Sequence, residues 1–192
     1  MSAAADAPEL RIGHGRLILV VGPSGAGKDT LIAGARAACA NDVSIVFPRR
    51  VITRASTAAE AHDTISVEEF RQAAALGRFA LWWEAHRNCY GIPAAMDDDI
   101  RARRTVVCNV SRTIVAAARE RYAAVTVVHV TAPPDVLQSR LESRERDSDG
   151  DLAARMARSA GVDRSLDADM VIENVAAPDL GIRRLVSVIR AV

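Results

Sequence analysis

The sequence predicts an α/β fold in which helices flank a central parallel sheet. Short apolar runs alternate with helical stretches along the 192 residues, which is typical of parallel strands joined by crossover helices. The first apolar run, residues 16–21, leads directly into the glycine-rich stretch GPSGAGKDT at 22–30, as a buried strand that ends in a loop would. No shift in composition marks a second domain. We therefore expect a flexible tail at 1–15 and one domain at 16–192.

Each element is expected from its own local pattern. Apolar runs predict strands at 16–21, 43–47, 78–83, 105–110, 124–130 and 169–174. Helices are expected at 28–40, 66–77, 94–103, 112–122, 133–146 and 179–192. The second of these helices has the clearest limits, because Ser66 can cap it, Glu69 follows three residues later and Gly77 can stop it. The stretch NCYGIP at 88–93 is expected to be a turn.

Composition favours a cytoplasmic protein with reduced cysteines over a membrane or nucleic-acid-binding protein. The net charge is +1, so no overall field attracts nucleic acid or a membrane surface. There is no signal-peptide pattern and no apolar segment of membrane-span length. The cysteines Cys39, Cys89 and Cys108 have no metal-binding spacing, so we expect reduced thiols. Of 25 basic residues the single lysine is Lys28, inside the glycine-rich stretch.

The stretch at 22–30 matches the phosphate-binding loop G-x-x-x-x-G-K-[ST] at every position but the last. Glycines let the backbone curl so that successive N–H groups face phosphate oxygens, and the helix that follows adds its positive end. We predict that ATP binds here and that Lys28 is catalytic, reaching the β- and γ-phosphates; the alternative is a glycine turn without a ligand. The predicted nucleotide-binding residues are Gly22, Pro23, Ser24, Gly25, Ala26, Gly27, Lys28, Asp29 and Thr30.

Asp29 stands where the motif has a hydroxyl residue that helps to hold Mg²⁺, and Thr30 comes one place late. Mg²⁺ prefers hard oxygen ligands, and a carboxylate is a good one. We hypothesise that Asp29 is a metal ligand, directly or through water, and makes nucleotide binding depend on Mg²⁺. The alternative is that an acid in the first helical turn only favours the helix dipole, by about 0.3–1 kcal/mol.

Arginines after the second expected strand suggest where an acceptor phosphate binds. Arg50 and Arg54 are four residues apart, so they share a face of an extended chain, and Arg49 points the other way. Arginine forks match phosphate oxygens in a bidentate manner. Tyr90 can offer its hydroxyl to a phosphate. The alternative for the arginines is a solvated basic edge without a ligand, and the alternative for Tyr90 is a half-buried aromatic residue in a turn.

Several motifs resemble the guanylate kinase branch of the P-loop nucleoside monophosphate kinases. They are GPSGAGK at 22–28, TR at 53–54, SVEEF at 66–70, NCYG at 88–91 and SRLESR at 139–144. The resemblance covers nearly the whole chain and implies a P-loop kinase fold with a small acceptor-binding segment at about 48–95 and a mobile lid at about 141–155. The acids that read guanine in that family are replaced by Leu81 and Ser111, a phosphate-gripping tyrosine by His62 and an arginine by Thr57.

A second set of motifs resembles the ribose 1,5-bisphosphate phosphokinase family. It comprises GPSGAGKDT at 22–30, RVITR at 50–54, Glu60 with His62, WEAH at 83–86 with YG at 90–91, and NVSR at 109–112. The resemblance implies ATP- and Mg²⁺-dependent conversion of ribose 1,5-bisphosphate to 5-phosphoribosyl 1-diphosphate in phosphonate catabolism. The accepting group is the phosphate on C1. Such a substrate needs cations and polar groups but no base pocket.

Site residues are assigned on this resemblance. The predicted substrate-binding residues are Arg50, Arg54, Glu60, His62, His86, Tyr90, Ser111 and Arg112. The alternative for each histidine is a packed or plain polar residue without a role in binding. The alternative for Arg112 is a position on the surface. Arg144 and Arg155 of the lid are predicted catalytic contacts to the moving phosphoryl group, against the alternative of a solvated, salt-bridged helix. No general base is required, because the acceptor phosphate is already anionic. Trp82 and Trp83 alternate in a strand, so one packs in the core and the other walls the pocket.

Two rival functions stay open at this stage. One is a true nucleoside monophosphate kinase, against which Leu81 and Ser111 argue. The other is a non-catalytic guanylate-kinase-like module that binds protein partners, against which the intact loop argues. The expected partner is a phosphorylated sugar, with neither nucleic acid nor a membrane. Oligomeric state is left open, with a homodimer as one option.

Overall fold

A computed structural model describes residues 11–54, 62–85, 87–142, 167–175 and 177–191. Its centre is a five-stranded sheet of order β2-β7-β1-β8-β9, in which every neighbouring pair is parallel. In that order the strands are Ile45–Val46, Thr105–Asn109, Arg16–Val21, Val125–Thr131 and Met170–Glu173. The predicted α/β class with a central parallel sheet is confirmed.

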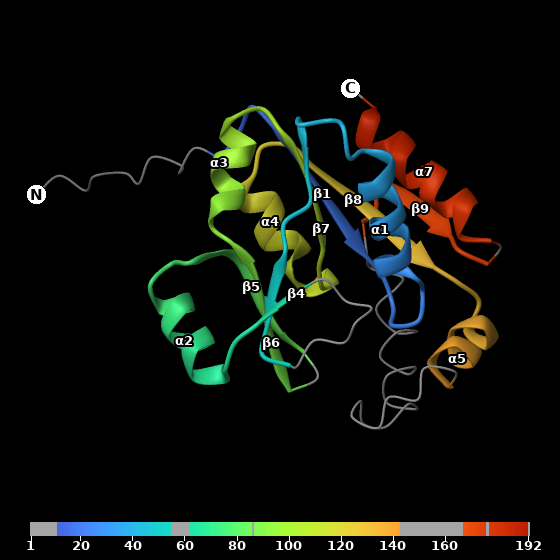
Figure 1. The fold of residues 1–192 in the computed structure, drawn as a ribbon, viewed down its shortest axis with the longest axis horizontal. Helices are drawn as coiled ribbons and strands as arrows, with labels where there is room; N and C mark the ends of the chain where they lie inside the picture. Colours follow the sequence, from blue (N-terminus) through green and yellow to red (C-terminus); the bar gives the residue numbers. More distant parts are fainter. Residues whose placement is uncertain (1–10, 55–61, 86, 143–166, 176, 192) are drawn as a thin grey trace, which may run out of the picture.

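Helices cover both faces of this sheet (Figure 1). On one side lie α1 (Lys28–Ala38) and α7 (Pro178–Arg190), which pack against each other. On the other lie α3 (Ala95–Arg101) and α4 (Val115–Arg121), the latter preceded by the short 3₁₀ helix η1 (Arg112–Ile114). The helix α5 (Pro134–Glu142) follows β8.

The alternation of side chains along β1 divides the core into two. Leu17, Leu19 and Val21 face α3, α4 and the second sheet, whereas Ile18 and Val20 face α1 and α7. All five are fully buried. Because successive side chains of a strand point to opposite faces, a strand buried on both faces needs the continuous apolar run that residues 17–21 provide.

A second, four-stranded sheet of order β4-β3-β6-β5 lies beside the first, with α2 (Val67–Ala75) packed on it (Figure 1). Its strands are β4 (His62–Thr64), β3 (Arg50–Ile52), β6 (Asn88–Pro93) and β5 (Phe79–Ala85). Ser66 and Glu69 form the predicted capping box at the start of α2. Trp83 is buried and Trp82 is 49% exposed, as their alternation predicts.

The prediction of a turn at 88–93 is wrong, because these residues form β6. They pair antiparallel with β5 and with β3, and the chain reverses at Arg87, which has a φ of 61°. Gly91 looked like a turn residue, yet a Cβ there would lie 2.5 Å from the ring of Phe79. Glycine is needed at this position because an aromatic ring from the neighbouring strand covers the backbone.

Other boundaries also differ from expectation. The strand expected at 43–47 shrinks to Ile45–Val46, because Asp42 accepts hydrogen bonds from the backbone and hydroxyl of Ser44 and bends the chain there. Within the predicted tail at 1–15, Ile12 forms a bridge with Tyr122, and the N–H of Gly15 donates to the carbonyl of Ile100, while the division of the chain at residue 15 stays a prediction. Residues 1–10 lie outside the described part of the chain.

The three cysteines are free and buried. Burial raises the pKa of the Cys108 thiol to about 12, so this group stays protonated at neutral pH. Within the described ranges, no helix has the length and apolar character needed to cross a membrane.

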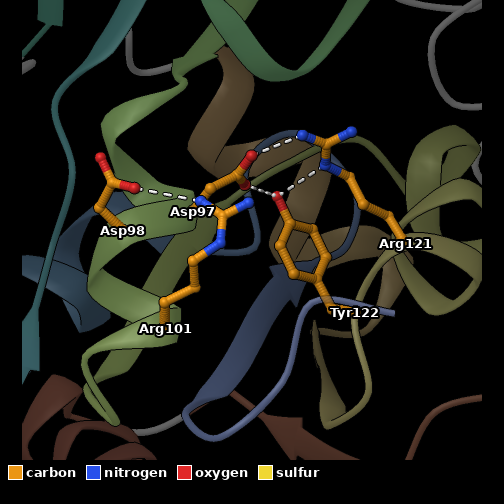
Figure 2. A network of polar contacts seen from close by, with 5 residues as sticks. All are labelled: Asp97, Asp98, Arg101, Arg121 and Tyr122. Atoms are coloured by element: carbon orange, nitrogen blue, oxygen red, sulfur yellow. Dashed lines mark hydrogen bonds and ion pairs between the residues drawn. The ribbon is translucent and has the colours of Figure 1, made fainter. Parts of the chain in front are cut away.

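A buried polar network ties α3 to the end of α4 (Figure 2). The Tyr122 hydroxyl donates to Asp97 Oδ1 at 2.6 Å, and Arg121 Nη2 donates to Asp97 Oδ2 at 2.5 Å. Burial and this hydrogen bond raise the pKa of Tyr122. On the same helix, the pair of Asp98 with Arg101 is exposed (Figure 2).

Replacing Tyr122 by Phe should therefore lower the free energy of unfolding by about 1–3 kcal/mol, because a buried carboxylate loses a donor. The matched control is Asp98→Ala, which breaks the exposed pair and removes one acid from the first turn of α3, and it should cost about 1 kcal/mol or less. Urea unfolding measures both, and equal losses in the two variants would contradict the assigned role of the buried network.

Candidate functional site

The phosphate loop connects β1 to α1 at the carboxyl ends of the parallel strands. Gly27 caps α1 with a φ of 87°, a left-handed conformation that favours glycine. Gly22 has a φ of 142°, and a Cβ there would lie 2.0 Å from the carbonyl oxygen of Val130 on β8. The loop can thus press against the neighbouring strand only because residue 22 has no side chain.

Lys28 is the first residue of α1, and its side chain folds back over the loop. Its Nζ donates to the carbonyl oxygens of Gly22 and Pro23, each at 2.7 Å. The ammonium therefore lies beside the backbone that would surround a bound phosphate. This position is compatible with its predicted contact to the β- and γ-phosphates.

Asn174, directly after β9, holds the phosphate loop through a side-chain hydrogen bond. Its Nδ2 donates to the carbonyl oxygen of Ala26 at 2.8 Å, and its own N–H donates to the carbonyl of Thr131. The side chain is buried. Sequence reasoning assigned no role to this residue; the available signal was an uncharged polar residue at the end of an apolar strand.

Asp29, in the first turn of α1, receives two side chains from other strands. Asn109 Nδ2, at the end of β7, donates to Asp29 Oδ1 at 2.7 Å. Arg50 Nη2, at the start of β3, lies 3.3 Å from the same oxygen. The Arg50 side chain is 17% exposed and that of Asp29 is 39% exposed.

These groups fit a nucleoside triphosphate with Mg²⁺. Backbone N–H groups at a helix N-terminus and a lysine suit phosphate oxygens. Among the described residues, no cluster of three or more His, Cys, Asp or Glu could hold a metal ion by itself. In kinase sites Mg²⁺ is commonly held by one or two carboxylates together with substrate phosphates, which is what a single carboxylate beside the loop can offer.

Those predicted acceptor residues that the structure describes lie on the second sheet, in the bend after β3 and just after β7. Arg54 lies in the bend after β3, and its carbonyl oxygen accepts from Thr64 and lies 3.3 Å from His62 Nε2. His62 is buried, so in this structure it supports the backbone that carries Arg54. Tyr90 is half-buried and stacks on Trp83.

Ser111 has a structural contact of its own. Its Oγ accepts from the backbone and the hydroxyl of Thr113 and so caps η1, whose first residue is the half-buried Arg112. Contacts of His62, Tyr90, Ser111 and Arg112 with substrate stay predictions. Four further predicted residues, Glu60, His86, Arg144 and Arg155, and the lid apart from residues 141 and 142, lie outside the described residues.

Comparison with known proteins gives close curated relatives. The chain is 55% identical to ribose 1,5-bisphosphate phosphokinase PhnN of Bradyrhizobium diazoefficiens over 93% of this chain and 90% of the relative. It is 50% identical to the enzyme of that name from Rhodopseudomonas palustris, over 98% of this chain and 95% of the relative. No protein-family model matches.

Among solved structures, the guanylate kinase of Anaplasma phagocytophilum resembles this fold with a TM-score of 0.68, over 95% of this chain and 87% of that one. Sequence identity to it is 18%, so this likeness concerns the fold alone.

The crowding around Gly27 gives a testable expectation. A Cβ at Gly27 would lie 2.4 Å from Asn174 Nδ2, whereas one at Gly77, which also has a left-handed backbone, would meet nothing within 4 Å. Both Gly→Ala variants should lose about 1–2 kcal/mol of stability through backbone strain. Only Gly27→Ala should also lose ATP affinity, by about 10–100-fold, because the loop is displaced. Calorimetric titration with ATP distinguishes the two variants. Similar ATP affinities in both would contradict the proposed role of Asn174 in holding the phosphate loop.

Proposed function

The chain belongs to the ribose 1,5-bisphosphate phosphokinase family, and we propose that it transfers the γ-phosphoryl group of ATP to the 1-phosphate of ribose 1,5-bisphosphate. The products are 5-phospho-α-D-ribose 1-diphosphate and ADP. The proposal includes a place in phosphonate catabolism and in the cytoplasm. A homodimer remains one option for the assembly.

The observation that carries the proposal is the contact between Arg50 and Asp29. It brings a cation of the second sheet next to the phosphate loop, so a donor phosphate and an acceptor phosphate can be bound side by side. Arginine suits an acceptor phosphate because its planar fork can hold two oxygens. In the proposed complex Lys28 binds the donor phosphates and Arg50 binds the acceptor phosphate.

The reaction needs alignment and charge neutralisation more than acid–base chemistry. An oxygen of the 1-phosphate attacks the γ-phosphorus, and the bond from that phosphorus to the β–γ bridging oxygen breaks as ADP leaves. The attacking oxygen is already anionic, so no side chain has to remove a proton. Lys28 stabilises the charge that develops on the β- and γ-phosphates.

In this proposal Asp29 holds Mg²⁺ together with the ATP phosphates. The metal supplies positive charge that screens the phosphates from one another and from this carboxylate. Arg144 and Arg155 are proposed to close over the transferred group from the lid, which is the common way in which such kinases complete their charge.

The positions that would read guanine support a sugar phosphate over a nucleotide as acceptor. Leu81 is buried in the apolar core, and Ser111 caps a helix. Neither offers a carboxylate to a base. A site that recognises a base by hydrogen bonds rejects it strongly once those groups are missing.

The direct test is an ADP-release assay with four acceptors: ribose 1,5-bisphosphate, GMP, AMP and gluconate. We expect turnover with ribose 1,5-bisphosphate and none above background with the other three. Turnover of GMP alone would replace the proposal with a guanylate kinase. Absence of both turnover and MgATP binding would favour a binding module.

Arg50 and Arg49 provide a matched pair for the acceptor site. Arg50→Ala should raise KM for ribose 1,5-bisphosphate by about 10–100-fold, as expected for a lost charge-assisted contact of about 1.5–3 kcal/mol. Arg49 is 58% exposed, pairs with the exposed Asp63 and donates to the backbone carbonyl of His62, so Arg49→Ala leaves the cation beside Asp29 in place and should leave KM within about twofold. Steady-state kinetics measure both, and equal effects would exclude Arg50 as the acceptor-binding arginine.

A further inference from the structure

The amide of Asn109 and the carboxylate of Asp29 form a contact in which the phosphate loop supplies the acid and the neighbouring strand supplies the neutral group. In P-loop nucleotide hydrolases the loop supplies a hydroxyl to Mg²⁺ and a separate aspartate supplies the carboxylate. Here the loop supplies the carboxylate, and the side chain facing it from the neighbouring strand is a neutral amide at 2.7 Å. The pair of Asp29 and Asn109 therefore has one negative charge, as a hydroxyl and an aspartate would, but the charge lies on the loop residue.

The fold fixes where Asn109 lies. It ends β7, and the register of β7 against β1 sets Asn109 opposite Val20, two residues before the loop begins. Asn109 is half-buried, and its backbone is held in the parallel ladder. Its amide therefore reaches the first turn of α1 from a rigid support.

An amide at residue 109 can donate a hydrogen bond to the Asp29 carboxylate, which an ionised acid at this position could not. Asn109 Nδ2 donates to Asp29 Oδ1, whereas two carboxylates at this distance would repel each other unless one bound a proton. Arg50 also approaches Oδ1. In the part of the chain that the structure describes, no hydrogen bond or ion pair goes to Asp29 Oδ2. One oxygen is thus held by protein donors and the other is left for a ligand.

We propose that Asn109 is a positioning residue for the metal site: by holding Oδ1 of Asp29, it leaves Oδ2 as the oxygen that binds Mg²⁺, directly or through water. The inference rests on the proposed use of MgATP but not on the identity of the acceptor. Partners that orient a metal ligand typically contribute 10–100-fold to metal affinity, roughly what one charge-assisted hydrogen bond supplies.

The test measures ATP affinity with Mg²⁺ and with EDTA, by displacement of a fluorescent ATP analogue. Asn109→Ala should weaken MgATP binding by about 10–100-fold while changing the affinity for metal-free ATP by less than about threefold. The control is Asn41→Ala, an exposed asparagine beyond the far end of α1, which should change neither. An affinity for MgATP within twofold of wild type, or equal losses with and without metal, would overturn the proposal.

A double-mutant cycle separates positioning from a merely structural effect. If Asn109 acts through Asp29, the substitution Asn109→Ala should cost less than about twofold in an Asp29→Ala background. An undiminished loss there would show an independent role and overturn the inference. Urea unfolding of each variant checks that the proteins are folded. The affinity measurements and the unfolding control do not involve an acceptor substrate, so failure of the acceptor assay leaves them interpretable.

Discussion

The site depends on how closely the phosphate loop is held against the carboxyl ends of the parallel strands. Three strands hold it, each in a different way. From β8, the carbonyl of Val130 approaches so closely that residue 22 must be glycine. After β9, Asn174 donates to the loop carbonyl of Ala26, and at the end of β7 the amide of Asn109 holds Asp29. A loop held on these sides keeps its backbone N–H groups in place before any ligand arrives, which lowers the cost of ordering the site on binding.

Asp29 also connects this loop with the second sheet. The ion pair of Asp29 with Arg50 is partly buried, so the loss of hydration offsets much of the attraction and its net contribution to stability is small beside that of the two apolar cores. Its value therefore lies in the site. It places Arg50, which we assign to the acceptor, beside Asp29, which we assign to the metal. The acceptor phosphate would then face the guanidinium of Arg50, and the donor phosphates would face the Mg²⁺ that Asp29 holds.

The sequence predicts those features that depend on neighbours in the chain. The strand at 16–21, the loop, the capping box at Ser66 and the alternation of Trp82 and Trp83 are all local patterns, and the structure has them. The strand β6 escaped prediction because Asn88, Gly91 and Pro93 look like turn residues until β5 is placed beside them. The contacts of Asn174 and Asn109 were not predicted for a similar reason, although Asn109 belongs to the NVSR motif. Their partners lie 148 and 80 residues away, and no local pattern specifies such contacts.

The fold is shared with a guanylate kinase at 18% identity, so substrate choice must come from individual side chains. On this account the difference begins with a carboxylate in the loop, an amide opposite it and no acid at residues 81 and 111. A crystal structure with Mg²⁺, ADP and 5-phosphoribosyl 1-diphosphate tests this most directly. The account predicts an Asp29 oxygen about 2.1 Å from the metal or one water away, with Arg50 moved from Asp29 onto a substrate phosphate. A metal that Asp29 contacts neither directly nor through one water, with Arg50 still paired with Asp29, would contradict the account.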